Sequence, residues 1–250
     1  KSLDIPADNG ITTLDILLSQ AHILGNQPLQ NPYAVIAADA NQSGSVSTLD
    51  LLLMQQIILQ FSEGVTGVDS WEMVPEQEDF IDANDALQFS GPTLLPEMGA
   101  FESIDFVAIK RGDVNFSWTQ AMVPTVQSLL ELHVETVIEE SQAKLVLSPS
   151  EYVELAGVQF TLEWPEDWEF VGWQSSCEMF SANESFIDEQ ALPIQFATSD
   201  LPVAFGPTLP LMELIFELPE VASIEVEEFK ISSSITAMEI CDAALNVLKP

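Results

Sequence analysis

The sequence contains an internal repeat that limits what its first quarter can fold into. Residues 11–24, ITTLDILLSQAHIL, return as residues 46–59, VSTLDLLLMQQIIL, so that Thr13 corresponds to Thr48 and Leu24 to Leu59. Self-similarity at a fixed period is the signature of a duplicated structural unit. A unit this short cannot bury an apolar face by itself. We therefore expect two helices that pack their apolar faces against each other.

Each copy has the apolar spacing of an amphipathic helix. In the first copy the apolar stripe consists of Leu14, Leu17, Leu18, Ile23 and Leu24. Hydroxyl side chains precede each stripe and predict the N-caps, Thr12 or Thr13 for the first helix and Ser47 or Thr48 for the second. Gly25 is a predicted helix stop, and residues 26–32 are predicted to form a polar turn.

The segment between the two copies has the pattern of a calcium-binding loop. It reads DANQSGSVSTLD from Asp39 to Asp50, with a glycine at the sixth position, where such loops turn sharply. Alternating positions of a tight loop direct their oxygens at one centre, and Ca²⁺ takes six to eight oxygen ligands. The predicted ligands at positions 1, 3, 5, 7, 9 and 12 are Asp39, Asn41, Ser43, Ser45, Ser47 and Asp50.

The upstream copy gives a less regular loop. Aligning Asp15 with Asp50 predicts Asp4, Asp8, Gly10, Thr12 and Asp15 as ligands, whereas Pro6 has no side-chain oxygen for the third position. An isolated Asp-x-Asn further along the chain, Asp113 and Asn115, offers the missing oxygens. The alternative for both loops is a pair of capped turns that bind no ion. With only two carboxylates in the Asp39 loop, the expected affinity is weak, on the order of 10⁻⁴–10⁻³ M.

Composition restricts the class of partner. Forty acidic residues against six basic ones give a formal net charge of −34, which repels nucleic acid and anionic lipid. Hydrophobic residues make up 47 % of the chain, so a core can form. The apolar run from Leu49 to Phe61 is interrupted by Asp50 and three glutamines, which predicts no membrane span. We interpret such an acidic surface as that of a protein in saline, calcium-containing water, and the alternative is that the charge only keeps the protein in solution.

The second half of the sequence predicts an all-β domain. Short apolar runs separated by turn residues suggest a β-sandwich, with strands expected over 130–139, 143–147, 158–163, 168–173, 194–197, 211–218 and 229–234. The fold class is therefore α+β in two domains, residues 1–120 and 121–250, with residues 62–104 expected to wrap around the helices. Cys177 and Cys241 are either one disulfide or two buried thiols.

The motifs of both halves resemble a known family. The loop–helix duplication is similar to a type I dockerin. More specifically, residues 10–15, 22–25, 32–39, 70–71 and 105–115 resemble a module of very large secreted proteins of Bacteroidetes. Residues 155–162, 211–216 and 231–239 resemble strands of a cohesin-like sandwich that accompanies it. The resemblance covers nearly the whole chain.

The resemblance carries several expectations. Such proteins are exported by the type IX secretion system and act as adhesins or filament subunits on the cell surface. The expected cofactor is Ca²⁺, and the expected partners are other modules of the same protein or neighbouring copies in a homo-oligomeric filament. In cellulosomes a dockerin binds a cohesin on another protein, whereas here both lie on one chain.

The sequence was also compared with the patterns of enzymes and of carbohydrate-binding or docking modules. No phosphate-binding glycine loop or nucleophile elbow is present, and no carboxylate pair stands out, so the sequence predicts no enzyme. A carbohydrate-binding or cellulosome-like docking module is the alternative. Trp164, Trp168 and Trp173 would stack on sugar rings or a cell-surface glycan if they were exposed, or would fill the core if they alternate along strands.

Overall fold

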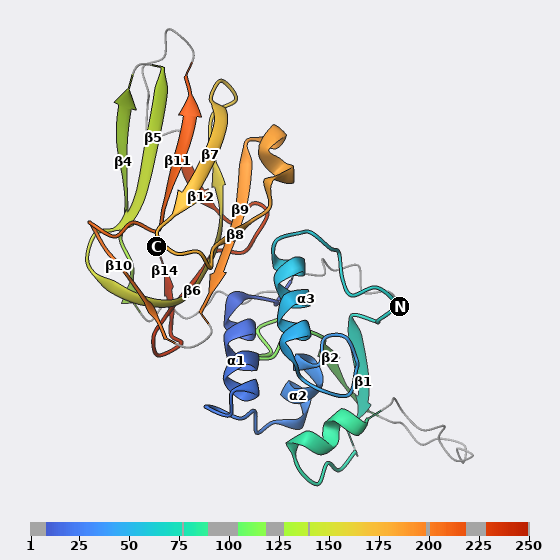
Figure 1. Ribbon diagram of the computed structural model, residues 1–250. Coiled ribbons are helices and arrows are strands. Elements are labelled where there is room, and N and C mark those ends of the chain that lie inside the picture. The colour runs from blue at the N-terminus through green and yellow to red at the C-terminus, as the bar shows by residue number, and fades with distance from the viewer. Residues whose placement is uncertain are drawn as a thin grey trace. The chain divides into compact units, whose positions relative to one another are not determined.

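The computed structural model describes residues 9–76, 78–89, 105–118, 128–139, 141–198, 201–218 and 229–249. The chain divides into two compact units, Lys1–Val123 and Pro124–Pro250. The first is built on helices and the second on strands (Figure 1), which agrees with the predicted α+β fold class. The boundary predicted between residues 120 and 121 stays a prediction, because residues 119–127 lie outside the described part.

The two sequence repeats form α1, Thr13–Ile23, and α3, Thr48–Ile58. These helices contact each other and lie side by side in Figure 1, as the repeat predicts. Thr12 and Ser47 are the N-caps, each in a capping box with the aspartate three residues later. Gly25 follows the C-cap of α1 with a φ of +73°, a left-handed conformation that glycine adopts without strain.

A third helix, α2, spans Pro32–Ala38 and was not predicted. The prolines around it predicted a turn. Pro32, however, occupies the first helical position, where a backbone N–H would have no partner within the helix, so that its absence costs no hydrogen bond. The side chain of Asn31 caps this helix by accepting a hydrogen bond from the Tyr33 N–H. Val35, Ala37 and Ala38 are fully buried, so tertiary packing supports a helix of only seven residues.

After α3, the first unit contains a two-stranded sheet, whose second strand brings the chain back to the helices. β1, Trp71–Pro75, pairs antiparallel with β2, Phe106–Lys110, and a 3₁₀ helix, η1, spans Ala83–Gln88. η1 and β2 both contact α2. η1 thus packs on a helix outside the predicted pair, and the wrapping of α1 and α3 by residues 62–104 stays a prediction, because residues 77 and 90–104 lie outside the described residues.

The second unit is a sandwich of two sheets. One sheet has the order β4-β5-β11-β7; in the other the order is β3-β14-β13-β6-β9-β8, with β10 and β12 also pairing with β6. The strands are β3 Ser128–Leu129, β4 Leu132–Glu139, β5 Gln142–Pro149, β6 Val153–Glu163, β7 Glu169–Ser175, β8 Ser181–Ala182, β9 Ala191–Ala197, β10 Val203–Phe205, β11 Met212–Glu217, β12 Lys230–Ser232, β13 Glu239–Asp242 and β14 Val247–Lys249, with a 3₁₀ helix η2 at Glu184–Glu189. Every predicted strand is present. β3, β8, β10, β13 and β14 were missed because they are short or lack a clear alternation.

One apolar core joins the two sheets. Alternate residues of β11, namely Met212, Leu214 and Phe216, face the same core as Phe160 of β6 and Phe196 of β9. Alternation along β11 gives one buried and one partly exposed face, as expected for a sheet covered on one side.

The tryptophans predicted as possible sugar platforms belong to this core. Trp164 and Trp168 are each 5 % exposed and pack around Phe216. The indole N–H of Trp173 donates to Glu184. The sugar-stacking interpretation is therefore wrong for Trp164 and Trp168, because a buried ring offers no face to a ligand, whereas Trp173 is only partly buried. Cys177 and Cys241 are not joined in a disulfide, so that alternative is wrong for this structure.

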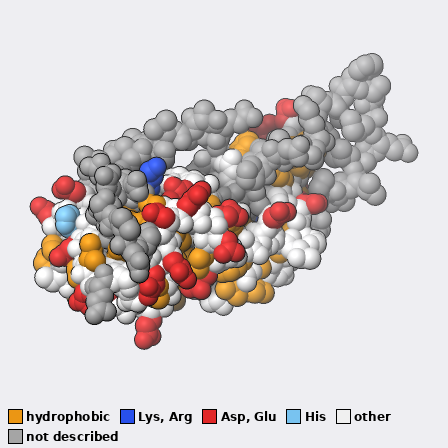
Figure 2. Space-filling model, turned by 90° about the horizontal axis from the view of Figure 1, so that it is seen from above, with side chains coloured by type: hydrophobic (Ala, Val, Ile, Leu, Met, Phe, Trp, Pro, Cys, Tyr) orange, Lys and Arg blue, Asp and Glu red, His pale blue; other side chains and the backbone are white. Residues whose placement is uncertain are grey.

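Acidic side chains are spread over the described surface rather than gathered in one patch. Figure 2 shows Asp and Glu at many separate places on the visible face. Among the described residues, no helix is both long enough and apolar enough to span a bilayer.

Candidate metal centre

The Asp39 loop turns its oxygens toward one another. The carboxylate of Asp39 accepts hydrogen bonds from the backbone N–H groups of Ser43 at 2.9 Å and Gly44 at 2.8 Å. The Ser43 N–H also donates to Oδ1 of Asn41 at 2.9 Å, and the Ser43 hydroxyl lies 3.2 Å from the carbonyl oxygen of Ser45. The oxygens of positions 1, 3, 5 and 7 are thus grouped around Ser43.

Asp50 closes this loop from the first turn of α3. Its Oδ1 accepts from the Asn41 N–H at 3.1 Å, and its Oδ2 accepts from the backbone N–H and the hydroxyl of Ser47. One carboxylate therefore caps the helix and anchors the start of the loop. The six ligands predicted from the sequence lie together in one loop.

A second loop with the same hydrogen bonds is assembled from two distant segments, and we call it the split loop. The carboxylate of Asp113 accepts from the N–H groups of Ser117 and Trp118, both at 2.9 Å. The Ser117 N–H also donates to Oδ1 of Asn115 at 2.8 Å, and the Ser117 hydroxyl donates to the carbonyl oxygen of Gly10 at 3.2 Å. Residues 113–118 thus reproduce residues 39–44, and Gly10 takes the place of Ser45.

Asp15 closes the split loop as Asp50 closes the other. Its Oδ1 accepts from the Asn115 N–H at 3.1 Å and its Oδ2 accepts from the N–H and hydroxyl of Thr12. The backbone agrees as well, because the fourth position is left-handed in both loops, with φ of 56° at Gln42 and 57° at Phe116. Residues other than glycine rarely adopt this conformation.

The structure assigns the predicted residues of the upstream copy as follows. Gly10, Thr12 and Asp15 lie together with Asp113 and Asn115, whereas Asp4 and Asp8 lie outside the described residues. Ser117 was missed. The sequence contained a signal for this residue, since Asp113-x-Asn115-x-Ser117 repeats Asp39-x-Asn41-x-Ser43. The signal was not recognised because the two halves of the split loop, residues 10–15 and 113–118, lie far apart in the sequence.

Two glycines allow the distant segments to meet. A Cβ on Gly10, whose φ is +84°, would lie 2.8 Å from the Cβ of Trp118. A Cβ on Gly112, whose φ is +90°, would lie 2.7 Å from Cδ1 of Ile11. Both positions therefore favour glycine for their left-handed conformation, and at Gly10 the Cβ and Cα of Trp118 also leave no space for a side chain.

The loops contain most of the buried charge of the described residues. Asp15 and Asp50 are fully buried, Asp113 is 2 % exposed and Asp39 is 4 % exposed, while Lys110 and Arg111 are the only buried cations in the described part of the chain. Burial raises the pKa of the Asp113 carboxyl, although the Trp118 and Ser117 N–H groups and the nearby Lys110 act in the opposite direction. Burying several carboxylates with so few cations is costly.

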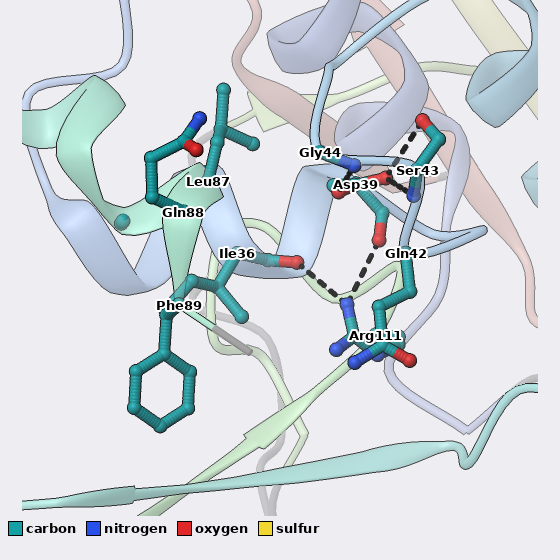
Figure 3. Close-up of a pocket in the computed structure, with 10 residues that line it drawn as sticks. Ile36, Asp39, Gln42, Ser43, Gly44, Leu87, Gln88, Phe89 and Arg111 are labelled. Carbon is teal, nitrogen blue, oxygen red and sulfur yellow. Dashed lines mark hydrogen bonds between the residues drawn. The ribbon is translucent and has the colours of Figure 1, made fainter. Parts of the chain in front are cut away.

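The two buried cations each support one loop. Nη1 of Arg111 donates to the carbonyl oxygens of Asp39 at 2.9 Å and Ile36 at 3.4 Å, as Figure 3 shows. Its Nη2 pairs with the carboxylate of Glu72 at 2.5 Å. Nζ of Lys110 donates to the carbonyl oxygen of Asn9, next to the split loop.

An open cavity of about 310 Å³ lies beside the Asp39 loop. Figure 3 shows the loop and Arg111 on one side and the end of η1 on the other. The cavity is lined by Ile36, Asp39, Gln42, Ser43, Gly44, Ala86, Leu87, Gln88, Phe89 and Arg111.

Within the described parts of the chain, no three His, Cys, Asp or Glu side chains cluster as a metal site. An ion in either loop would therefore be bound by the two carboxylates of that loop together with amide, hydroxyl and carbonyl oxygens.

Comparison with protein families gives one match. Residues 2–59 match the dockerin type I domain. The dockerin-matching segment contains both repeats and the whole Asp39 loop, but it ends well before Asp113. Dockerins are protein–protein docking modules without catalytic activity. No curated protein matches the chain.

Solved structures similar to the chain include cohesins. A type I cohesin–dockerin complex from Clostridium thermocellum is 10 % identical with a TM-score of 0.38, covering 49 % of this chain and 93 % of that one. A type I cohesin from Pseudobacteroides cellulosolvens is 7 % identical (TM-score 0.36; 49 % and 84 % covered). A non-cellulosomal cohesin from the archaeon Archaeoglobus fulgidus is 11 % identical (TM-score 0.35; 49 % and 84 % covered).

Proposed function

We propose that this chain is a non-enzymatic docking and structural module that calcium stabilises, and that it works outside the cell as part of a larger surface protein or filament. The observation that carries the proposal is the burial of four aspartates in two loops with the same hydrogen-bond pattern. Each loop contributes one aspartate at its first position and one at its last. A divalent cation would offset the charge of each pair.

The chemistry of the donors fits Ca²⁺. Carboxylate, amide, hydroxyl and carbonyl oxygens are the hard ligands that Ca²⁺ prefers, and neither loop contains a nitrogen or sulfur ligand. One ion would be held by Asp39, Asn41, Ser43, Ser45, Ser47 and Asp50. The second would be held by Asp113, Asn115, Ser117, Gly10, Thr12 and Asp15. When bound, calcium supplies positive charge and links the loop to its helix.

An exposed apolar face on α3 supports a docking role. Leu49 and Leu52, three positions apart and therefore on one side of the helix, are 51 % and 48 % exposed. The equivalent of Leu52 in the first repeat, Leu17, is only 5 % exposed. A helix face of this kind suits a protein partner, which we propose to be another module of the same protein or a neighbouring copy.

The setting is inferred from the same features. The dockerin match and the net charge of −34 favour an extracellular or cell-surface protein in water that contains calcium. The resemblance to Bacteroidetes surface proteins extends this proposal to type IX secretion and to adhesion or filament formation.

Thermal unfolding with excess calcium and then with chelator tests the proposal. Calcium should raise the melting temperature of the intact chain, and the rise should shrink in Asp39→Ala/Asp50→Ala and in Asp113→Ala/Asp15→Ala. Glu63→Ala, which removes an exposed acid from the same unit, is the matched control and should keep the full rise. A melting temperature that calcium does not change would mean that both loops are capped turns.

A further inference from the structure

The two segments that form the split loop, residues 10–15 and 113–118, stand at opposite ends of the first unit in the sequence. We call the part of the chain from Gly10 to Trp118 the helical unit. The Ser117 hydroxyl and the Gly10 carbonyl that it contacts are 107 positions apart in the sequence. Between these two points lie α1, α2, α3, β1, η1 and β2. The chain therefore enters and leaves this unit at one place.

Several contacts hold the entering and leaving segments together. The Val114 N–H donates to Oδ1 of Asp15 at 2.8 Å, and Nζ of Lys110 donates to the Asn9 carbonyl. Gly10 lies so close to Trp118 that only a glycine fits. The ring of Trp118 packs edge to face on Trp71, with centroids 4.8 Å apart, which fixes the leaving segment against β1.

We propose that the split loop is a mechanical closure of the helical unit, which carries tension applied along the chain. Tension applied along the chain reaches this unit at Gly10 and leaves it at Trp118. While the closure holds, the force passes across the contact between the two segments and bypasses the three helices and the β1–β2 sheet. The inference rests on the proposed calcium site, because an ion with ligands from both segments would join them directly.

The Asp39 loop provides an internal contrast. All its ligands lie within one stretch of twelve residues, so an ion there closes only a short loop. Linking residues that are far apart in sequence removes more freedom from the unfolded chain than linking near neighbours, and the difference grows slowly with the loop length. Two loops with the same donors should therefore differ in mechanical effect, and only the split loop should resist force applied through the chain ends.

Single-molecule pulling of the full chain from its two ends tests the closure. In calcium, the intact chain should show one resisted opening of the helical unit that releases about 350 Å of extended polypeptide. In chelator, and in Asp113→Ala with calcium present, the opening force should fall below that of the intact chain in calcium. In Asp39→Ala, the matched change at the same loop position, the opening force should stay near that of the intact chain.

A calcium titration of the same proteins separates the two proposals. If the intact chain binds no calcium, the proposed function and the closure both fail. If calcium binds but the opening force is unchanged in chelator, or falls equally in Asp39→Ala and Asp113→Ala, the calcium site stands and the closure is wrong. Ser117→Ala, which keeps both carboxylates, repeats the test if Asp113→Ala does not fold, and it should also lower the opening force.

Discussion

The backbone N–H of Val114 donates a 2.8 Å hydrogen bond to Oδ1 of Asp15, joining residues 99 positions apart. Asp15 also caps α1 through Thr12. A single carboxylate thus links the start of the first helix to the end of the helical unit, and its replacement should affect both.

Asp15→Ala should destabilise the protein even without calcium. The substitution leaves the N–H groups of Thr12, Val114 and Asn115 without their acceptor, and each unpaired buried donor costs about 1–3 kcal/mol. We expect a loss of about 3 kcal/mol or more, measured by urea unfolding in chelator. Asp50→Ala is the matched variant and removes the acceptor of two backbone donors, Asn41 and Ser47. An equal or larger loss in Asp50→Ala would contradict the special role of Asp15.

Gly112→Ala should be more damaging than a glycine substitution made elsewhere at a similar φ. At Gly112 the new methyl group would collide with Ile11, whereas a Cβ on Gly67, with φ of +78°, would contact nothing within 4 Å. Gly67→Ala should therefore cost only the left-handed conformation, about 1 kcal/mol. Gly112→Ala should cost about 1–3 kcal/mol more. Equal losses in chemical denaturation would show that the contact with Ile11 relaxes freely.

Breaking the pair of Arg111 and Glu72 should destabilise the unit that contains the Asp39 loop. Arg111→Met leaves the largely buried carboxylate of Glu72 without a cation to offset its charge, at a cost of about 3–5 kcal/mol. The double variant Arg111→Met/Glu72→Met removes both charges and should recover part of this loss. Urea unfolding of the two single variants and the double variant forms a mutant cycle. Additive losses would mean that the two side chains act independently.

The repeat allows one apolar contact to be compared at two equivalent positions. Leu17 of α1 is buried and Leu52 of α3 is about half exposed. Leu17→Ala should cost about 2–5 kcal/mol, whereas Leu52→Ala should change stability by about 0.5 kcal/mol or less. Similar losses in thermal unfolding would show that the exposed face of α3 is covered in solution.

Lowering the pH should destabilise the protein through His22. Burial lowers the pKa of this imidazole in the folded state, and Nδ1 accepts a hydrogen bond from the Leu29 N–H at 3.1 Å. The unfolded chain then takes up the proton more readily than the folded one. The stabilisation is complete above the unfolded pKa, about 6.5, and declines as the pH falls from there through the lower folded pKa. Urea unfolding at pH 7.5 and 5.5 should show a smaller pH effect in His22→Gln, and an unchanged effect would assign it to other groups.

Features that depend on near neighbours could be predicted from the amino-acid sequence. The repeat predicted α1 and α3, the hydroxyls before each stripe predicted the N-caps, and the spacing from Asp39 to Asp50 predicted a loop whose oxygens converge. These features follow from helical periodicity and from hydrogen bonds within a dozen residues. The seven predicted strands were found for the same reason, since alternation along a strand is a local signal.

Features that depend on partners distant in sequence became visible only in the folded chain. Asp113 and Ser117 meet Gly10 and Asp15 because β2 returns the chain to the helices, and no local pattern specifies that return. Packing also made identical repeat positions unequal, burying Leu17 and leaving Leu52 exposed, and it placed Trp164 and Trp168 in the core. Burial is a property of the assembled fold, so identical residues in equivalent helices acquired different environments once the rest of the unit packed around one of them.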